Sequence, residues 1–288
     1  MTRKPSSVWS IAIYSGESPL SLSPRGGIRK PILTMDDVKD IPSRFLADPF
    51  MVRHGTQWVL FCEVMNGDTG RGEIAVAFSD DAVTWDYGGT VLREPFHLSY
   101  PHVYNWGGEF YMVPETVHSG HVMAYRAKRF PFEWEPPFPI LDGSFADPTI
   151  FEHEGRWSMF LCGTPGRHDT LLLFLATSPF GPWKPHPLNP LISNNASIAR
   201  PAGKVIHWNG MPLRFAQDCI PAYGTRVRAF HILELTESSY RETEAPESPV
   251  LSPGKGWNSS GMHHIDAHRL EQNEWIACVD GYRMVEHP

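Results

Sequence analysis

Short apolar runs separated by polar turns recur along the chain as one repeated unit. The first clear unit opens at Ala47-Asp48-Pro49, continues through an apolar strand and a Gly turn, and ends a second apolar strand at Glu63. The same order returns 52 residues later, and again 99 residues from the first unit, before two more altered units follow. Repeats of about 40–50 residues are typical of propellers and related arrays. The residues that open the five units are Asp48, Tyr100, Asp147, Arg200 and His264.

Each unit carries two more strand signals after its first hairpin. In the first unit a turn at 66–70 precedes the apolar run 74–78, and a fourth run ends at Leu92. Four strands per unit make a propeller blade, so the sequence predicts an all-β, five-bladed β-propeller. The fifth unit stops after two strands, but residues 8–34 resemble the outer strands of the third unit and are predicted to close the last blade. The predicted blades of this single domain are 45–98, 99–145, 146–197, 198–257, and 258–288 together with 8–34.

Composition and charge narrow the class of protein. Of the 288 residues 41% are hydrophobic, which is enough for a large core. The net charge of −7, without a basic block, argues against a nucleic-acid partner. No apolar run approaches the roughly 18 residues of a membrane helix, and none follows Arg3 and Lys4, so we expect neither a membrane span nor a signal peptide. Cysteines fall in four different units, which predicts reduced core residues in a cytoplasmic protein. They are Cys62, Cys162, Cys219 and Cys278.

Propeller geometry predicts where the polar residues gather. The first strand of a blade lines the central channel and the second returns antiparallel, so the start of one and the end of the other emerge on the same face. The five opening residues should therefore ring one mouth of the channel. Such clusters generally serve a function, because repulsion and desolvation destabilise them. The alternative is structural: Asp-Pro begins a strand, and polar residues fill a wet channel. The residues closing the second strands are Glu63, Glu115, Gln217 and Asp280, and their polar neighbours are His102, Asp218, His263, Asp266 and His268.

Several motifs resemble known families. Ala47-Asp48-Pro49 and Ala146-Asp147-Pro148 resemble the motifs of the five-bladed glycoside hydrolases of families 43, 32 and 68. Together with residues 94–101 and Ala199-Arg200-Pro201-Ala202-Gly203, the whole chain is similar to another group. That group is the propeller at the N-terminus of plant glucosamine inositolphosphorylceramide transferases, which also occurs as stand-alone or fused bacterial proteins.

The resemblance to the hydrolases implies catalytic roles. Asp48 would be the general base or nucleophile, and Asp147 would tune the acid and hold a sugar hydroxyl. The blade-four glutamate that serves as general acid is replaced by Arg200, which cannot donate a proton near neutral pH. Cleavage of a glycoside ordinarily needs a second, protonated carboxyl group. A neighbour of Arg200 would be held ionised, which argues against it as the acid. The candidates for the acid are, in order, Glu115, Asp218 and Glu63.

Arg200 has two further interpretations. Its guanidinium could grip a phosphate or carboxylate of a sugar phosphate, nucleotide sugar or uronic acid. Alternatively, it forms a salt bridge to Asp147 or Asp48 that neutralises the channel.

The histidine-rich stretch from Met262 to His268 raises the question of a metal ion. On a strand, His264, Asp266 and His268 share one face and could bind a divalent cation. Strand neighbours two apart are about 6.5–7 Å from each other, which is awkward for three ligands. We therefore expect no cofactor and favour hydrogen bonding to sugar hydroxyls or acid–base chemistry by a histidine. Trp257 lies in a Gly-rich loop and is a candidate for stacking on a sugar.

Three functions compete on this sequence. The first, which we prefer, is a carbohydrate-active enzyme that hydrolyses or transfers a glycosyl unit in the central funnel. The second is an isomerase, lyase or cyclase that uses the same ring of His, Asp and Glu, since one fold hosts many chemistries. The third is a non-catalytic module that binds a glycan or sugar phosphate and serves a partner glycosyltransferase. The expected partner is thus a small molecule or glycan.

Overall fold

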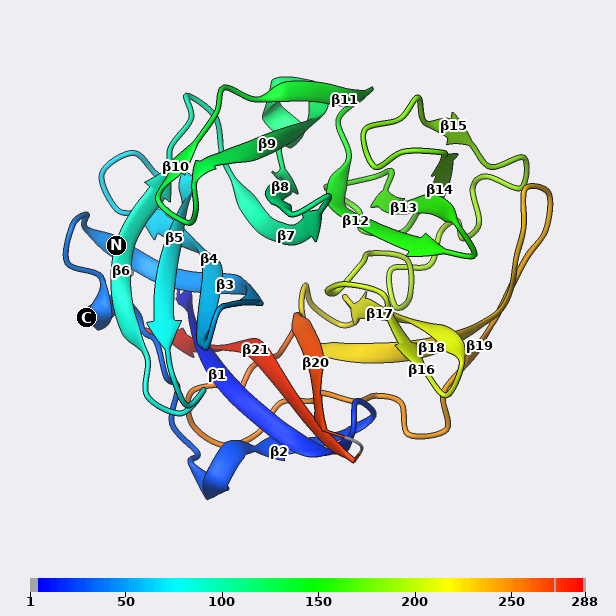
Figure 1. Cartoon of the computed structure of the whole chain (residues 1–288). Coiled ribbons are helices and arrows are strands. Elements are labelled where there is room, and N and C mark those ends of the chain that lie inside the picture. The colour runs from blue at the N-terminus through cyan, green and yellow to red at the C-terminus, as the bar shows by residue number, and fades with distance from the viewer. Residues whose placement is uncertain (1–4, 272, 287–288) are drawn as a thin grey trace.

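The computed structural model describes residues 5–271 and 273–286, and these form five antiparallel sheets around a common centre (Figure 1). This confirms the predicted all-β, five-bladed propeller. Within the described ranges the helical segments are three single 3₁₀ turns, and no helix is long and apolar enough to cross a membrane. The turns are η1 (Arg25–Gly27), η2 (Met35–Asp37) and η3 (Val117–Ser119).

Each of the first four blades is built from strands that follow one another along the chain from the centre of the ring outward. Blade 1 consists of β3 (Ser43–His54), β4 (Gln57–Asn66), β5 (Gly72–Ser79) and β6 (Asp86–Leu92). Blade 2 consists of β7 (Ser99–Trp106), β8 (Glu109–Glu115) and β9 (His121–Arg129), with both β10 (Glu133–Trp134) and β11 (Phe138–Asp142) paired to β9. Blade 3 consists of β12 (Ala146–His153), β13 (Arg156–Cys162), β14 (Leu171–Ala176) and β15 (Lys184–Pro185). Blade 4 consists of β16 (Ile206–Trp208), β17 (Met211–Asp218), β18 (Arg226–Leu235) and β19 (Tyr240–Glu244).

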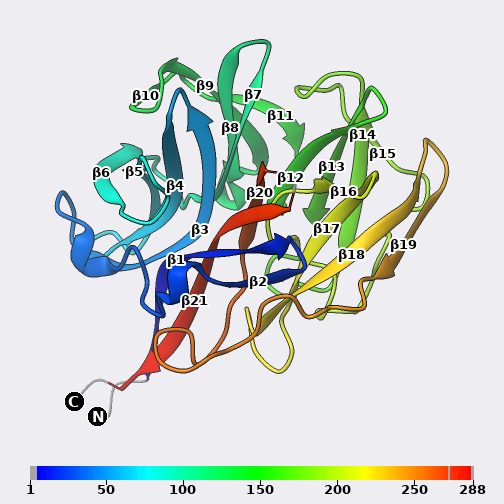
Figure 2. The same cartoon turned by 60° about the horizontal axis from the view of Figure 1, so that its bottom comes forward.

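The fifth blade joins the two ends of the chain. Its inner strands are β20 (Ile265–Glu271) and β21 (Glu274–Val285), and its outer strands are β1 (Ser6–Ser18) and β2 (Ser21–Pro24). The pairing of β1 with β21 runs from Ser6 opposite Val285 to Gly16 opposite Trp275. Figure 2 shows β21 running out of the ring alongside β1. The predicted closure, two strands from each end of the chain, is confirmed; residues 272 and 287–288 of the predicted blade lie outside the described ranges.

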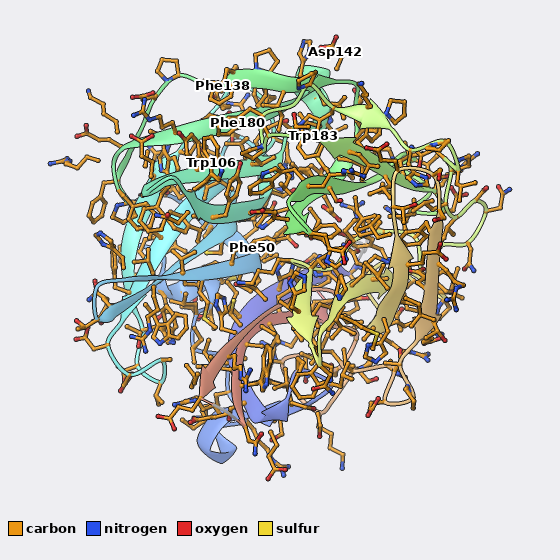
Figure 3. The ribbon with its side chains drawn as sticks, turned by 45° about the vertical axis from the view of Figure 1, so that its right-hand side comes forward. Phe50, Trp106, Phe138, Asp142, Phe180 and Trp183 are labelled. Atoms are coloured by element: carbon orange, nitrogen blue, oxygen red, sulfur yellow. The ribbon has the colours of Figure 1, made fainter. Side chains whose placement is uncertain are left out.

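Apolar side chains pack between neighbouring blades. The cluster between blades 5 and 1, for example, joins Ile11 and Ile276 to Leu60. All four cysteines are buried and unpaired, as predicted for core residues. At the rim between blades 2 and 3, Trp106 packs edge-on against Phe180 with ring centroids 5.3 Å apart (Figure 3).

Gly203 lies at a close approach between blades 4 and 5. Its backbone has φ +133°, and a Cβ there would lie 1.8 Å from the carbonyl oxygen of Ile265. Its N–H donates a hydrogen bond to the hydroxyl of Tyr100 over 2.8 Å. We therefore expect Gly203→Ala to lower the free energy of unfolding by at least about 3 kcal/mol, measured by urea denaturation. Gly166→Ala is the control, because no atom lies within 4 Å of a Cβ there; an equal loss in both variants would contradict the close packing.

Candidate functional site

The opening residues of blades 1, 2 and 3 share one strained backbone conformation. Asp48, Tyr100 and Asp147 have φ values of 51°, 48° and 52°, each at a bulge between the first two strands. L-residues seldom adopt such angles, which concentrate at functional sites. Each of their backbone N–H groups donates a hydrogen bond to a carboxylate of the preceding blade. The N–H of Asp48 donates to Asp280 (2.9 Å), that of Tyr100 to Asp48 (3.2 Å), and that of Asp147 to Glu115 (3.3 Å). These carboxylates thus tie neighbouring blades together while gathering at one mouth of the channel.

We call this group the mouth cluster. Its members are Asp48, Glu63, Glu115, Asp147, Arg200, Gln217, His263 and Asp280.

Arg200 is fully engaged within the protein. Its Nε and Nη2 donate to the two oxygens of Asp147 over 2.6 and 3.2 Å, and Nη2 also donates to Glu115 over 3.1 Å. Nη1 reaches Nδ1 of His168 (2.9 Å) and the carbonyl of Pro165 (3.4 Å). A guanidinium has five N–H donors, so none is left for a ligand anion. Of the two interpretations of Arg200, the structure shows the salt bridge, made to Asp147.

Asp147 and Glu115 are therefore held as anchors. Gln217 donates a further hydrogen bond to Asp147 over 2.9 Å, and Asp147 is 1% exposed. Burial raises the pKa of Asp147 to about 7, although the charge of Arg200 opposes the shift. Oε2 of Glu115 accepts hydrogen bonds from Arg200 and from the N–H of Asp147, so this oxygen faces donors. The geometry therefore does not favour Glu115, our first sequence-based candidate, as the general acid.

Asp280 and His263 form a second buried pair beside Asp48. Asp280 accepts four hydrogen bonds: from the backbone N–H of Asp48, His263 and His264, and from His263 Nδ1 at 2.8 Å. Burial by itself raises the pKa of Asp280, but its attraction to His263 and these hydrogen bonds outweigh burial and hold the pKa below its usual range. Burial likewise opposes the positive charge of His263, but Asp280 prevails and raises the pKa of this imidazole. Trp9 stacks on the imidazole ring of His263, with the ring centroids 4.1 Å apart.

Asp48 has one oxygen committed and one not. Oδ2 accepts the N–H of Tyr100, while Oδ1 lies 3.6 Å from Nε2 of His263 and 3.8 Å from Nδ1 of His264, beyond hydrogen-bonding range. The pKa of Asp48 is raised to about 7, mainly by burial; the positive charge of His263 opposes the shift, and the negative charges of Asp280 and Asp147 add to it.

Deeper in the channel the predicted His264, Asp266 and His268 do not converge on one point. His264 is fully buried, its ring lying against Phe50 and Tyr100, and neither ring nitrogen has a hydrogen-bond partner among the described residues. Phe50 lies near the middle of the propeller in Figure 3. Burial lowers the pKa of His264 to about 4, so the ring is neutral.

The side chain of Lys204 occupies the position beside Asp266 where a bound metal cation would balance the charge of this carboxylate. Its Nζ lies 2.8 Å from Oδ1 of Asp266 and 2.8 Å from Nε2 of His268. Burial alone would raise the pKa of Asp266, but Lys204 and His268 hold it well below its usual range. The predicted metal alternative at His264, Asp266 and His268 therefore does not fit, because an ammonium group already neutralises the carboxylate.

Another set of potential metal ligands lies in the mouth cluster. Ligand atoms of Asp48, His263 and Asp280 lie within 4.8 Å of one another. However, Oδ1 of Asp280 already accepts three hydrogen bonds, one of them from Nδ1 of His263, and Oδ2 accepts the N–H of Asp48, so the groups that a metal would need are engaged with each other. The donor set is that of a hydrogen-bonded carboxylate–histidine pair.

Some predicted residues lie apart from the mouth cluster. Asp218 forms an ion pair with Arg228 at 3.0 Å. His102 accepts the N–H of Ile150 and stacks on Phe50 within the channel. Trp257 packs against the apolar cluster of blades 4 and 5.

Three side chains at the mouth were missed by the sequence analysis. Tyr223, 37% exposed, lies 5.2 Å over the guanidinium of Arg200 and 5.2 Å from the ring of His263. Trp9 and His168 are the other two. All three lie outside the first hairpins of the units, which are the part that repeats along the sequence. The position of Trp9, just before the apolar run of β1, was the one sequence signal for any of them.

An apolar groove of about 1280 Å³ borders the cluster. Trp9 and Tyr223, which contact His263, also line this groove, together with the ends of β1 and β21. One ligand can therefore touch both the polar cluster and the apolar groove.

Comparison with known proteins places the chain in a family. The family model described as glucosamine inositolphosphorylceramide transferase 1, N-terminal, matches residues 2–282. The chain belongs to this family. Glucosamine inositolphosphorylceramide transferase 1 of Arabidopsis thaliana is 37% identical over 298 residues, covering 96% of the chain and 39% of that protein. The protein of the same name from Oryza sativa subsp. japonica is 34% identical over 301 residues, covering 96% and 40%. The chain thus spans about two fifths of the length of these relatives, and the family resemblance seen in the sequence is confirmed.

Solved structures share the fold at low identity. The catalytic domain of the Coprinopsis cinerea GH62 alpha-L-arabinofuranosidase superposes with a TM-score of 0.59 at 12% identity, covering 93% of this chain and 97% of that one. A thermostable family-43 glycoside hydrolase gives 0.58 at 15% identity, covering 72% and 78%. At these identities the similarity shows the fold alone.

Proposed function

We propose that this propeller hydrolyses or transfers a glycosyl unit at the mouth cluster, with Asp48 as the general base or nucleophile. The observation that carries the proposal is the state of the Asp48 carboxylate. It is held in a strained backbone conformation, one oxygen is fixed by Tyr100, and the other has no hydrogen-bond partner within the described part of the chain. A pKa of about 7 suits a base that works near neutral pH.

The other groups around Asp48 have supporting roles in this proposal. Asp280 holds both the backbone of Asp48 and the ring of His263, so that Nε2 faces the free oxygen of Asp48. A water or hydroxyl between these two groups would accept a hydrogen bond from one and give its proton to the other. Asp147, fixed by Arg200 and Gln217, would orient the sugar.

The apolar groove bears on the substrate. The relatives are named for inositolphosphorylceramide, an amphiphile with a charged head and a lipid tail. In the proposed function the glycosyl unit lies at the mouth cluster and an apolar portion lies in the groove beside Trp9 and Tyr223. Since the relatives extend well beyond this propeller, a partner glycosyltransferase is part of the proposal.

One observation favours a second candidate, a binding module without catalysis. Arg200 stands at the opening of blade 4 and locks Asp147 and Glu115 in a closed network, which removes two carboxyl groups from proton transfer. Such a site would bind a glycan without turning it over.

A screen of aryl glycosides and nucleotide sugars separates these functions. We expect the wild-type protein to release the aglycone or nucleotide from at least one of them, measured by absorbance and mass spectrometry, because Asp48 is available as a base. Binding without turnover, measured by calorimetry with the same compounds, would favour the binding module. If the protein neither turned over nor bound any of these compounds, both candidate functions would be contradicted.

A further inference from the structure

We propose that Glu63 is the proton donor of the mouth cluster and takes the place of the missing blade-four glutamate. The inference rests on the proposed function. Glu63 lies near the end of β4, and its Cα pairs with that of Ala47, the residue before Asp48. The two carboxyl groups therefore approach the mouth from the same blade. Glu63 keeps 7% side-chain exposure, close to the 8% of Asp48.

Glu63 differs from the other acidic candidates in its partners. Glu115 is paired with Arg200 and Asp218 with Arg228, whereas the ring that faces Glu63 belongs to His97, with Nε2 3.4 Å from Oε1. Oε1 is buried and has no hydrogen-bond partner among the described residues.

The hydrogen bonds of His97 show which atom carries the proton. Nδ1 of His97 accepts the N–H of Gly72 over 2.9 Å, so in the neutral ring the hydrogen lies on Nε2, the nitrogen 3.4 Å from Oε1 of Glu63. A proton on Oε1 would be crowded by this N–H group, so the acidic proton belongs on Oε2. Gly72 closes the carboxyl group in, because a Cβ there would lie 2.6 Å from Oε1.

The surrounding charges favour a neutral Glu63. Burial raises its pKa well above the usual range, and the negative charges of Asp48, Glu115 and Asp280 raise it further. Burial also lowers the pKa of His97 to about 4, with the charges of His118 and Arg200 adding to the effect, so His97 supplies no positive charge. Asp48 and Glu63 then form a pair in which one carboxyl ionises near neutral pH and the other stays protonated, the combination that glycosyl cleavage needs.

In the reaction, Oε2–H of Glu63 protonates the leaving oxygen while the bond between that oxygen and the anomeric carbon breaks. The electron pair of that bond goes to the oxygen, and Glu63 becomes a carboxylate. Asp48 either bonds to the anomeric carbon, in which case water or an acceptor hydroxyl then attacks that carbon and breaks this bond, or takes a proton from the water or hydroxyl that attacks the carbon directly. Glu63 regains its proton from the incoming water or acceptor hydroxyl, directly or through solvent.

The test compares leaving groups. For the sugar that the wild-type protein turns over, phenyl glycosides need a proton donor, whereas 2,4-dinitrophenyl glycosides leave without one. We expect Glu63→Gln to lower kcat/KM by roughly 10²–10⁴-fold on the phenyl glycoside. On the dinitrophenyl glycoside the loss should be less than about tenfold, because proton donation contributes little there. An equal loss on both substrates, or no loss, would overturn the role of Glu63.

Glu73→Gln is the matched control. Glu73 belongs to the same blade and its side chain is 8% exposed against 7% for Glu63, but it is paired with Arg93 at 2.8 Å and accepts a hydrogen bond from Asn66 at 2.8 Å. We expect this variant to keep the wild-type dependence on the leaving group.

A second measurement needs no substrate. At pH 8 the infrared spectrum should contain the carbonyl stretch of a protonated carboxyl group that is lost in Glu63→Gln and kept in Glu73→Gln. Absence of that band from the wild-type protein would overturn the assignment of the proton. If the band is present but no glycoside or nucleotide sugar is turned over, the protonated state stands while the proposed function, and the donor role with it, fails.

Discussion

Replacing Asp48 by asparagine is expected to stabilise the fold at pH 8 while reducing turnover at least about a thousandfold, as removal of a base or nucleophile does. Asn can keep the hydrogen bond from the N–H of Tyr100, since its side-chain oxygen can occupy the place of Oδ2. The variant thus removes the charge and the base but keeps the support of the backbone.

The pH dependence of this effect follows from the raised pKa of Asp48. The folded-state pKa of about 7 lies above the unfolded value near 3.9, so the folded protein binds the proton more tightly. The resulting stability is fully present below about pH 4 and is lost as the pH rises through 7. Above that, the buried charge costs up to about 4 kcal/mol relative to the protonated carboxyl.

Melting temperatures measured by thermal unfolding at pH 5 and pH 8 test this pH-dependent contribution of Asp48 to stability. We expect Asp48→Asn to melt close to the wild-type protein at pH 5 and above it at pH 8. Asp142→Asn is the control, because that side chain is 93% exposed and should shift neither value. A variant equally destabilised at both pH values would show that Asp48 is an uncharged structural element and would contradict a titrating base.

Arg200→Ala is expected to be the most destabilising single change at the mouth. It would leave Asp147 and Glu115 without their cation, and Asp147 is 1% exposed. Removing one partner of a buried ion pair typically costs about 3–5 kcal/mol, so we expect a loss of that size at pH 7 in urea denaturation. The loss should shrink as the pH falls below about 7, because burial raises the pKa of Asp147 to about 7 and the protonated carboxyl group no longer needs a cation.

Arg129→Ala provides the comparison. Arg129 is paired with Glu133 at 2.6 Å, but its side chain is 71% exposed, and such pairs contribute about 0.2–1 kcal/mol. Similar losses in both variants would mean that Arg200 contributes no more than a surface charge. The network around Asp147 would then be looser than the structure shows.

The repeat of the sequence was sufficient to predict the architecture. Side chains of a strand alternate between its faces, so a unit that returns with the same order of strands and turns must return its polar opening residue to the same place in each blade. Asp48, Tyr100 and Asp147 accordingly share one positive φ and lie at one mouth. The closing of the last blade by the N-terminal strands was predictable for the same reason, because an open edge would leave backbone groups unpaired.

What the sequence by itself determined is therefore the five blades and the set of polar residues at the mouth. Their pairing was decided only in three dimensions. Arg200 meets Glu115 across 85 residues of chain, and Lys204 meets His268 across 64. Trp9 reaches His263 because β1 and β21 remain paired beyond the part of β21 that pairs with β20. These contacts depend on distances of a few ångströms between blades, where charge and desolvation select the partners, and a pattern along one strand carries no information about its neighbour.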